Sequence, residues 1–237
     1  MKSLKKELLK YQHTDSALRY LPIVDDIHRS GQKNKILEIG AGGLGIYPYI
    51  GEKIYAVDLS FNSDRSDQVR MISSKAQNLP FKDKTFDIVV AVDMLEHIPP
   101  LLRIEVIREF LRVAIKKVYI AFPSGPYAEE HDRKYHQYYL TKRGKSFHFF
   151  EDHLEYGLPA KEFVEESIIE IANKMGRIVK ISKSNNVNIL LRNLLMYLWI
   201  NNYNTLYHYT MLFCNVRKWL NMGKCYRSIL VVQFEGQ

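Results

Sequence analysis

The sequence has few cysteines and no long run of apolar residues. Cys214 and Cys225 are its only cysteines, and their spacing matches neither a metal site nor a disulfide framework, so we expect a reducing, cytoplasmic environment. The longest apolar stretch, 187–200, is interrupted by asparagine and arginine and is too short to span a bilayer. The basic N-terminus is followed by no apolar run of the kind that a signal peptide needs. These absences argue against a secreted or membrane-spanning protein.

Internal repeats and low-complexity tracts are also missing. The 237 residues are 46% hydrophobic and 25% charged, as in an ordinary globular chain, and they suffice for one domain with insertions. Positive charge is concentrated near the C-terminus. Residues 172–237 contain nine Lys or Arg and one Glu, and the resulting net charge of +8 equals that of the whole chain. Such a segment suits an anionic substrate, a membrane surface or nucleic acid. We expect no specific nucleic-acid binding, since no nucleic-acid-binding motif is present.

A glycine cluster directly follows the apolar segment Ile36–Ile39, which is predicted to be a buried strand. Gly40, Gly42 and Gly45 allow a sharp turn and the close approach of a ligand to the backbone. The free amides of a helix that begins at this turn would suit a pyrophosphate or a carboxylate. Asp58 ends the next predicted strand, where its carboxylate could accept hydrogen bonds from both hydroxyls of a ribose. The pattern therefore predicts a nucleotide-type cofactor site.

Glu38 distinguishes this site from that of a typical dehydrogenase, whose strand is apolar at this position. An acid there suits a ligand with an ammonium group, such as S-adenosylmethionine (SAM), which also carries a carboxylate and a ribose. Leu-Pro-Phe at 79–81 and Leu-Glu-His at 95–97 flank a further predicted strand. With these blocks in this order, residues 18–125 resemble the class I SAM-dependent methyltransferases, in the branch marked by Leu-Pro-Phe and Leu-Glu-His (type-11-like).

The resemblance implies an α/β fold with a Rossmann-like, doubly wound sheet of seven strands, mostly parallel with an antiparallel last strand, and helical lid insertions. By position it assigns cofactor binding to Glu38, Gly40, Ala41, Gly42, Asp58, Leu59, Gln77, Asp93 and Met94. The first four would lie under the methionine half of SAM, Asp58 would hold the ribose, Leu59 would contact the adenine, and Asp93 with Met94 would lie beside the methionine amine.

One position departs from the family pattern. Members commonly have an acid four residues before Leu-Pro, where it contacts the adenine amine, and this chain has Lys75 there. A lysine cannot accept that hydrogen bond. Either Gln77 or a backbone carbonyl near Ala76 takes over, or the affinity for the cofactor is weakened.

The predicted elements form one methyltransferase domain over residues 1–237. Strands are expected near 34–39, 53–58, 70–74, 86–92, 117–122, 177–182 and 228–234, with a helix at about 160–175. The core comprises about 18–125, 160–185 and 224–235. Insertions occupy about 123–159 and 186–223.

The first insertion and the end of the fourth strand supply candidate acceptor residues. Tyr127, His131 and Tyr156 are candidates for substrate binding, and His97 and His136 for catalysis by removal of a proton. For each of them a structural role is the alternative: His97 would order the loop before the next helix, and the others would belong to a solvated helix. No cluster with metal-ligand spacing is present, so we predict no metal site and metal-independent transfer.

The second insertion combines leucines at helical spacing with many aromatic residues. They would form core packing between inserted helices, a site for a lipid-linked acceptor, a peripheral contact with the inner membrane surface, or a dimer face. We therefore predict a methyltransferase that acts on a small-molecule or sugar- or lipid-linked polar acceptor. The alternatives are a non-catalytic scaffold with a membrane- or partner-binding tail and an NAD-dependent oxidoreductase. The acceptor atom and the oligomeric state stay open.

Overall fold

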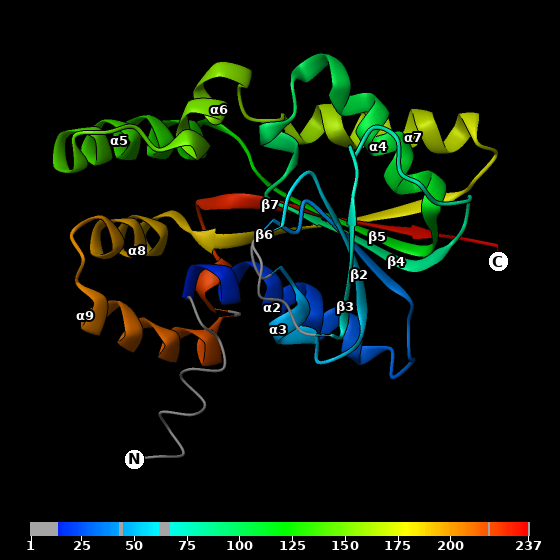
Figure 1. Ribbon diagram of the computed structural model, residues 1–237, viewed down its shortest axis with the longest axis horizontal. Coiled ribbons are helices and arrows are strands. Elements are labelled where there is room, and N and C mark those ends of the chain that lie inside the picture. Colours follow the sequence, from blue (N-terminus) through cyan, green and yellow to red (C-terminus); the bar gives the residue numbers. More distant parts are fainter. Residues whose placement is uncertain (1–13, 43–44, 62–66, 218, 237) are drawn as a thin grey trace.

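One seven-stranded sheet organises the computed structural model, which describes residues 14–42, 45–61, 67–217 and 219–236 (Figure 1). The basic N-terminal residues considered as a signal peptide lie outside these ranges. The strands are β1 (Ile36–Ile39), β2 (Ile54–Asp58), β3 (Val69–Ser73), β4 (Phe86–Val92), β5 (Ala114–Pro123), β6 (Val179–Asn188) and β7 (Cys225–Phe234). Their order in the sheet is β3-β2-β1-β4-β5-β7-β6.

The strand directions confirm the predicted fold class. Strands β1 to β5 pair in parallel, whereas β7 is antiparallel to both β5 and β6. The apolar runs of β1 and β4 are buried along almost their whole length, as expected for parallel strands covered on both faces. Ile39 pairs with Val57 and with Ala91, so the carboxyl ends of β1, β2 and β4 meet at one edge of the sheet. The strand order reverses there, between β1 and β4, which is where open α/β sheets bind ligands.

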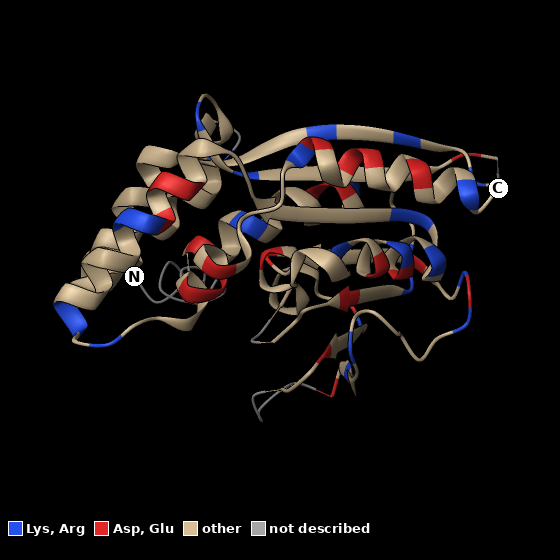
Figure 2. Cartoon of the chain, turned by 90° about the horizontal axis from the view of Figure 1, so that it is seen from above, with Lys and Arg blue, Asp and Glu red and all other residues tan. Residues whose placement is uncertain are grey.

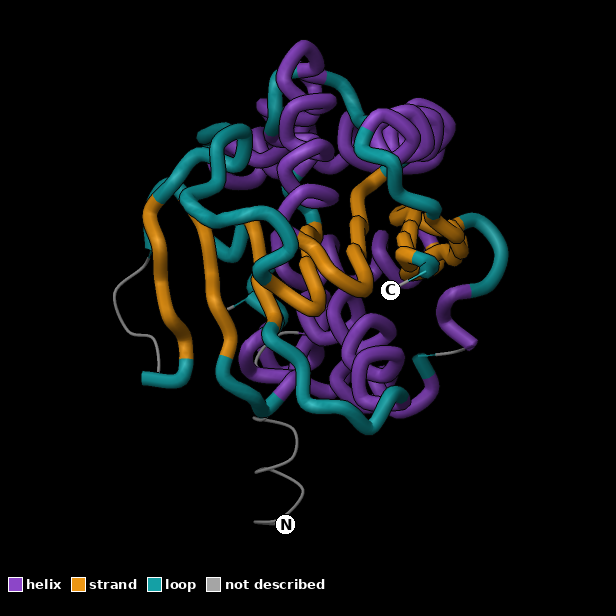
Figure 3. The backbone as a smooth tube through the Cα atoms, turned by 90° about the vertical axis from the view of Figure 1, so that its right-hand side faces the viewer, coloured by secondary structure: helices purple, strands orange, loops and turns teal. Residues whose placement is uncertain are grey.

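Helices cover both faces of the sheet, as the end-on view shows (Figure 3). On one face lie α2 (Thr14–Arg29) and α3 (Tyr47–Ile50), and on the other lie α4 (Arg103–Val113) and α7 (Lys161–Lys174). Short 3-10 turns, η1 (Leu95–His97) and η2 (Pro100–Leu102), connect β4 to α4. Because both faces of the sheet are apolar, each helix layer encloses a buried hydrophobic cluster.

The two predicted insertions are helical and pack against each other. The first forms α5 (Pro126–Arg143) and α6 (His148–Tyr156), and the second forms α8 (Ile189–Ile200), α9 (Asn204–Tyr209), η3 (Thr210–Val216) and η4 (Trp219–Asn221). Tyr139 of α5 stacks on Trp199 of α8, and Tyr135, Phe150 and Met196 share a buried cluster with it. Aromatic residues of the second insertion thus form packing between inserted helices.

One strand is longer than predicted from the sequence. Strand β6 continues to Asn188, six residues beyond the predicted 182, because all but one of its residues from Val179 to Asn188 pair with the long strand β7. Figure 2 shows Lys and Arg residues interspersed with Asp and Glu along the chain. None of the helices in the described ranges combines the length and the apolar character needed to cross a bilayer.

Candidate functional site

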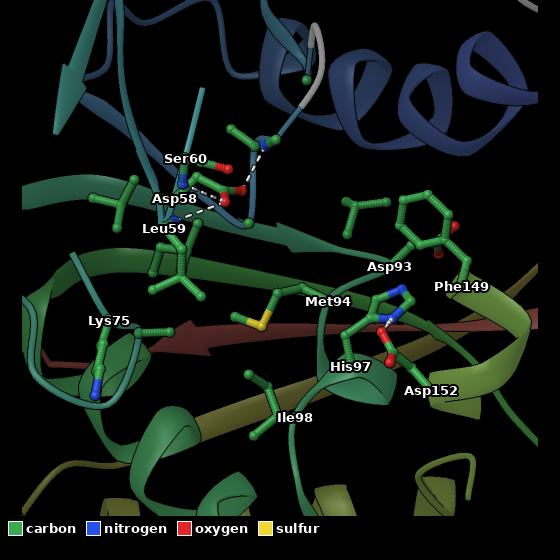
Figure 4. A pocket seen from close by; sticks show the side chains of 18 of the residues that line it. Asp58, Leu59, Ser60, Lys75, Asp93, Met94, His97, Ile98, Phe149 and Asp152 are labelled. Atoms are coloured by element: carbon green, nitrogen blue, oxygen red, sulfur yellow. Dashed lines mark hydrogen bonds and ion pairs between the residues drawn. The ribbon is translucent and has the colours of Figure 1, made fainter. Parts of the chain in front are cut away.

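A cavity of about 940 Å³ opens at the carboxyl ends of β1, β2 and β4 (Figure 4). Loops after these strands form one wall, and helices α2 and α6 contribute the other. The polar and glycine residues in its lining are Ser16, Arg19, Tyr20, Gly40, Gly42, Gly45, Tyr49, Asp58, Ser60, Ser74, Lys75, Gln77, Asp93, His97, His148 and Asp152. The volume is near the upper end of the range for small-molecule sites. All the predicted cofactor residues except Glu38 are therefore brought together in this lining, at the edge of the sheet where a ligand is expected.

The glycine turn forms the floor of the cavity, and Glu38 holds it from behind. The Gly40 amide donates to the Val57 carbonyl at 2.9 Å, and a Cβ on Gly40 would lie 2.4 Å from Cγ of Met94. The Glu38 side chain is 1% exposed, and its two oxygens accept from the Ile46 amide at 3.0 and 2.9 Å. Glu38 is not among the lining residues. The structure therefore places its carboxylate against the backbone of the turn and outside the cavity lining, and a contact with a ligand ammonium stays a prediction.

Asp58 lies in the cavity wall and also caps the turn that follows β2. Its Oδ2 accepts from the Gly42 amide at 2.6 Å, and its Oδ1 accepts from the amides of Leu59 and Ser60 at 2.7 and 3.4 Å. The structure therefore shows Asp58 both in the cavity lining and as the cap of this turn, and ribose binding stays a prediction. Leu59 is 69% exposed beside it, and Gln77 also lines the cavity.

Asp93 belongs to a buried ion network at the end of β4. Its carboxylate pairs with Arg227 of β7 through both oxygens and with Arg19 of α2 at 3.0 Å. Burial alone would raise the pKa of Asp93, but the two guanidinium groups outweigh it and lower the pKa to about 2. Asp93 also has a φ of 50°, which turns the chain so that Met94 faces the cavity.

His97 and Asp152 form a hydrogen-bonded pair in the cavity wall. His97 Nδ1 and Asp152 Oδ2 are 2.8 Å apart, and Phe149 of the same helix α6 packs edge-on against the imidazole (Figure 4). Burial and the neighbouring His153 lower the pKa of His97, so its imidazole is neutral at pH 7. A neutral imidazole whose Nδ1 is fixed by a carboxylate presents Nε2 for a proton or a ligand.

Four candidates of the first insertion lie outside the cavity. His131 is buried and binds Oδ1 of Asn193 through Nδ1, His136 packs on Phe150, Tyr127 lies under the ammonium group of Lys224, and the Tyr156 carbonyl accepts from Arg103. Their positions do not support the assignment of these four residues to a substrate pocket or, for His136, to catalysis. The physical reason is that α5 leaves the sheet edge and packs along α8.

Several lining residues were not predicted from the sequence. Ser16, Arg19 and Tyr20 come from α2, and His148 and Asp152 come from α6. Neither helix carries a motif that points to the cavity. Asp152 pairs with a histidine 55 positions away in the chain, so only the packing of α6 on η1 brings the two together.

Comparisons with known proteins agree with this geometry. Residues 37–122 match the model of a family described as "Methyltransferase domain". No match is found among curated protein sequences. Among solved structures, a SAM-dependent methyltransferase from Thermotoga maritima, described as a possible histamine N-methyltransferase, is 12% identical over 98% of this chain and 95% of its own, with a TM-score of 0.52. Phosphoethanolamine N-methyltransferase 2 of Haemonchus contortus in complex with SAM is 19% identical over 87% of this chain and 50% of its own, also with a TM-score of 0.52.

Proposed function

We propose that this chain, which carries a class I SAM-dependent methyltransferase domain, transfers the methyl group of SAM to a polar group of a small molecule. The observation that supports an acceptor of this kind is the enclosure of the cavity by α2 and α6, which bring Arg19, Tyr20 and Asp152 opposite the ends of the strands. The sulfonium already makes the methyl group electrophilic. The protein then has to hold the acceptor in line with the bond to sulfur and exclude water.

The cofactor would lie along the ends of β1, β2 and β4. In this proposal the ribose hydroxyls share the Asp58 carboxylate with its backbone donors, and Leu59 and Gln77 contact the adenine. The methionine half lies over Gly40 and Gly42 and ends beside Met94. Because Lys75 cannot accept from the adenine amine, Gln77 or a backbone carbonyl near it serves that edge.

The acceptor would occupy the end of the cavity formed by His97, Asp152 and Phe149. A hydroxyl acceptor has to lose its proton during transfer, and His97 is the neutral group placed there. A histidine that accepts such a proton contributes about 10²- to 10⁴-fold to the rate. An amine acceptor that is already neutral would depend on His97 much less. Free sugars and the sugar or polar headgroup of a lipid-linked molecule both fit this chemistry.

Product formation with matched variants tests this proposal. The purified chain is incubated with SAM and a panel of small polyols, sugars, amines and lipid-linked sugars, and release of S-adenosylhomocysteine is measured. With a hydroxyl acceptor, His97→Ala is expected to lower kcat at least 100-fold and Asp152→Asn to a smaller extent. Tyr127→Phe is the control, since Tyr127 lies outside the cavity, and it should keep the wild-type rate. Full activity of His97→Ala on a hydroxyl acceptor would contradict the proposed acceptor end.

A further inference from the structure

Behind His97 lies a compact group of ionisable side chains that the proposed transfer does not use. Glu96 comes from η1, His153 from α6 and Asp132 from α5. Glu96 and Asp132 are each 1% exposed and His153 is 9% exposed. The rings of His97 and His153 are adjacent, with centroids 4.9 Å apart. Three segments that are distant in the sequence therefore bring two imidazoles and two carboxyl groups to one place.

Two atoms in this group are buried without a hydrogen-bond partner. They are Oε2 of Glu96 and Nε2 of His153, and the closest approach between these two side chains is 4.0 Å, from Glu96 Oε1 to His153 Nε2. That distance is too long for a hydrogen bond. Burying an unpartnered carboxylate oxygen and an imidazole nitrogen costs free energy, so such atoms call for a partner that the protein itself does not provide.

Each imidazole is held by a carboxylate on its other nitrogen. His153 Nδ1 is 2.7 Å from Asp132 Oδ2, and His97 Nδ1 is 2.8 Å from Asp152 Oδ2. This arrangement fixes the ring orientation and leaves Nε2 with its lone pair, as is typical of histidines that bind a metal ion. Within the described ranges, no lysine or arginine lies within ion-pair distance of Glu96, Asp132 or Asp152. The group therefore contains three carboxylates whose direct ionic partners are only histidines.

From this geometry we propose that Glu96, His97 and His153 bind a divalent cation in the wall of the cavity. One ligand atom of each of the three residues lies within 4.8 Å of the other two. Metal-ligand bonds of about 2.0 to 2.2 Å need the ligand atoms closer than this, so the Glu96 carboxyl group, whose Oε2 has no hydrogen-bond partner, would have to move towards the two imidazoles. Two imidazoles and one carboxylate suit first-row transition ions such as Zn²⁺, Mn²⁺ or Co²⁺ better than Ca²⁺ or Mg²⁺, which prefer oxygen ligands.

The three protein ligands leave coordination positions open, and His97 lines the cavity. A cation at this place can bind an acceptor oxygen and lower the pKa of its proton. With a cation bound, the cation takes over the activation of the hydroxyl acceptor that the proposed function assigns to the His97 imidazole, and His97 serves as its ligand. This role in transfer rests on the proposed function, whereas cation binding does not. It is at odds with the prediction of a metal-independent enzyme, which considered only spacing along the chain, and the titration below decides between the two.

Metal titration of the full chain tests the site without SAM or an acceptor. Protein freed of metal with a chelator is titrated with Zn²⁺, Mn²⁺, Co²⁺, Mg²⁺ and Ca²⁺ by calorimetry, and the visible spectrum of the Co²⁺ form reports on its coordination. We expect one equivalent of Zn²⁺ or Co²⁺ to bind in preference to Mg²⁺ and Ca²⁺. Glu96→Gln and His153→Gln should each weaken this binding at least 10-fold. His136→Gln is the matched control on α5 and should bind as wild type, and circular dichroism verifies that each variant is folded.

The absence of stoichiometric binding, or equal binding by Glu96→Gln, His153→Gln and wild type, would overturn the site. The role in transfer is tested separately by measuring turnover before and after chelation. Loss of turnover that Zn²⁺, Mn²⁺ or Co²⁺ restores supports that role, and unchanged turnover overturns it. Failure of SAM to bind would refute the proposed function but would leave the metal titration interpretable, so the two proposals can fail independently.

Discussion

Gly40→Ala should destabilise the protein more than an alanine at another glycine of similar backbone conformation. Gly40 has a φ of 76°, and an added Cβ would lie 2.4 Å from Cγ and 2.8 Å from Cβ of Met94. The left-handed backbone costs a non-glycine residue about 1 to 2 kcal/mol, and overpacking a buried contact costs about 1 to 3 kcal/mol more. Cβ of Met94 cannot rotate away. We therefore expect a loss of about 2 to 5 kcal/mol.

Gly51→Ala is the matched control for this prediction. Gly51 has a φ of 70°, and a Cβ there would meet no atom within 4 Å, so only the backbone cost of about 1 to 2 kcal/mol applies. Urea unfolding followed by circular dichroism gives the free energy of unfolding of both variants and of the wild type. Equal losses in Gly40→Ala and Gly51→Ala would refute the inference that Met94 closes against the glycine turn.

Three further predictions concern the ion network, a buried histidine and the cavity wall. Among the described residues, Asp93→Asn leaves the buried Arg227 without a counter-charge and leaves Arg19 with Asp15 as its only ionic partner. It should lower the free energy of unfolding by about 3 to 5 kcal/mol in urea titrations, and a loss below about 1 kcal/mol would contradict this. Burial and Arg192 lower the pKa of His131 to about 4. The neutral imidazole therefore contributes up to about 3 kcal/mol to the free energy of unfolding above pH 6.5, and this contribution is lost as the pH falls towards 4. The free energy of unfolding of His131→Asn should vary less over that interval, and the same pH profile as wild type would argue against the lowered pKa. Leu59→Ala removes a largely exposed side chain, so the free energy of unfolding should change by no more than about 0.5 kcal/mol. The affinity for SAM, measured by calorimetry, should fall about 10-fold because an apolar contact is lost. An unchanged affinity would exclude Leu59 from the cofactor site.

The cofactor half of the fold could be predicted from the sequence because its signals are local. The apolar run of β1, the glycine cluster and Asp58 lie within one short stretch, and strand periodicity fixes the edge of the sheet at which they meet. The functional role of Glu38 illustrates the limit of such reasoning. The sequence shows an acid two residues before the first glycine. It does not show that the side chain of this acid is directed at the backbone of the turn, where it accepts a hydrogen bond from the Ile46 amide.

The acceptor half could not be predicted because its residues are joined only by packing between helices. Asp152 reaches His97 across two helical elements, and Arg19 reaches Asp93 from a helix that precedes the whole motif. His131 carries no sequence signal that separates a buried structural histidine from a ligand. Several apolar side chains of residues 186–223 are exposed, such as Leu190 and Trp219. They are compatible with the predicted membrane contact of this segment, which stays a prediction.

The most direct test of the account is a calorimetric titration of the purified chain with SAM, S-adenosylhomocysteine and NAD, carried out in parallel on Asp58→Ala. We predict that SAM and S-adenosylhomocysteine bind and that NAD does not. We also predict that Asp58→Ala weakens both affinities at least 10-fold, about 1.4 kcal/mol. Equal binding of SAM by wild type and Asp58→Ala would place the cofactor elsewhere, and absence of SAM binding to the wild-type chain would contradict the central claim.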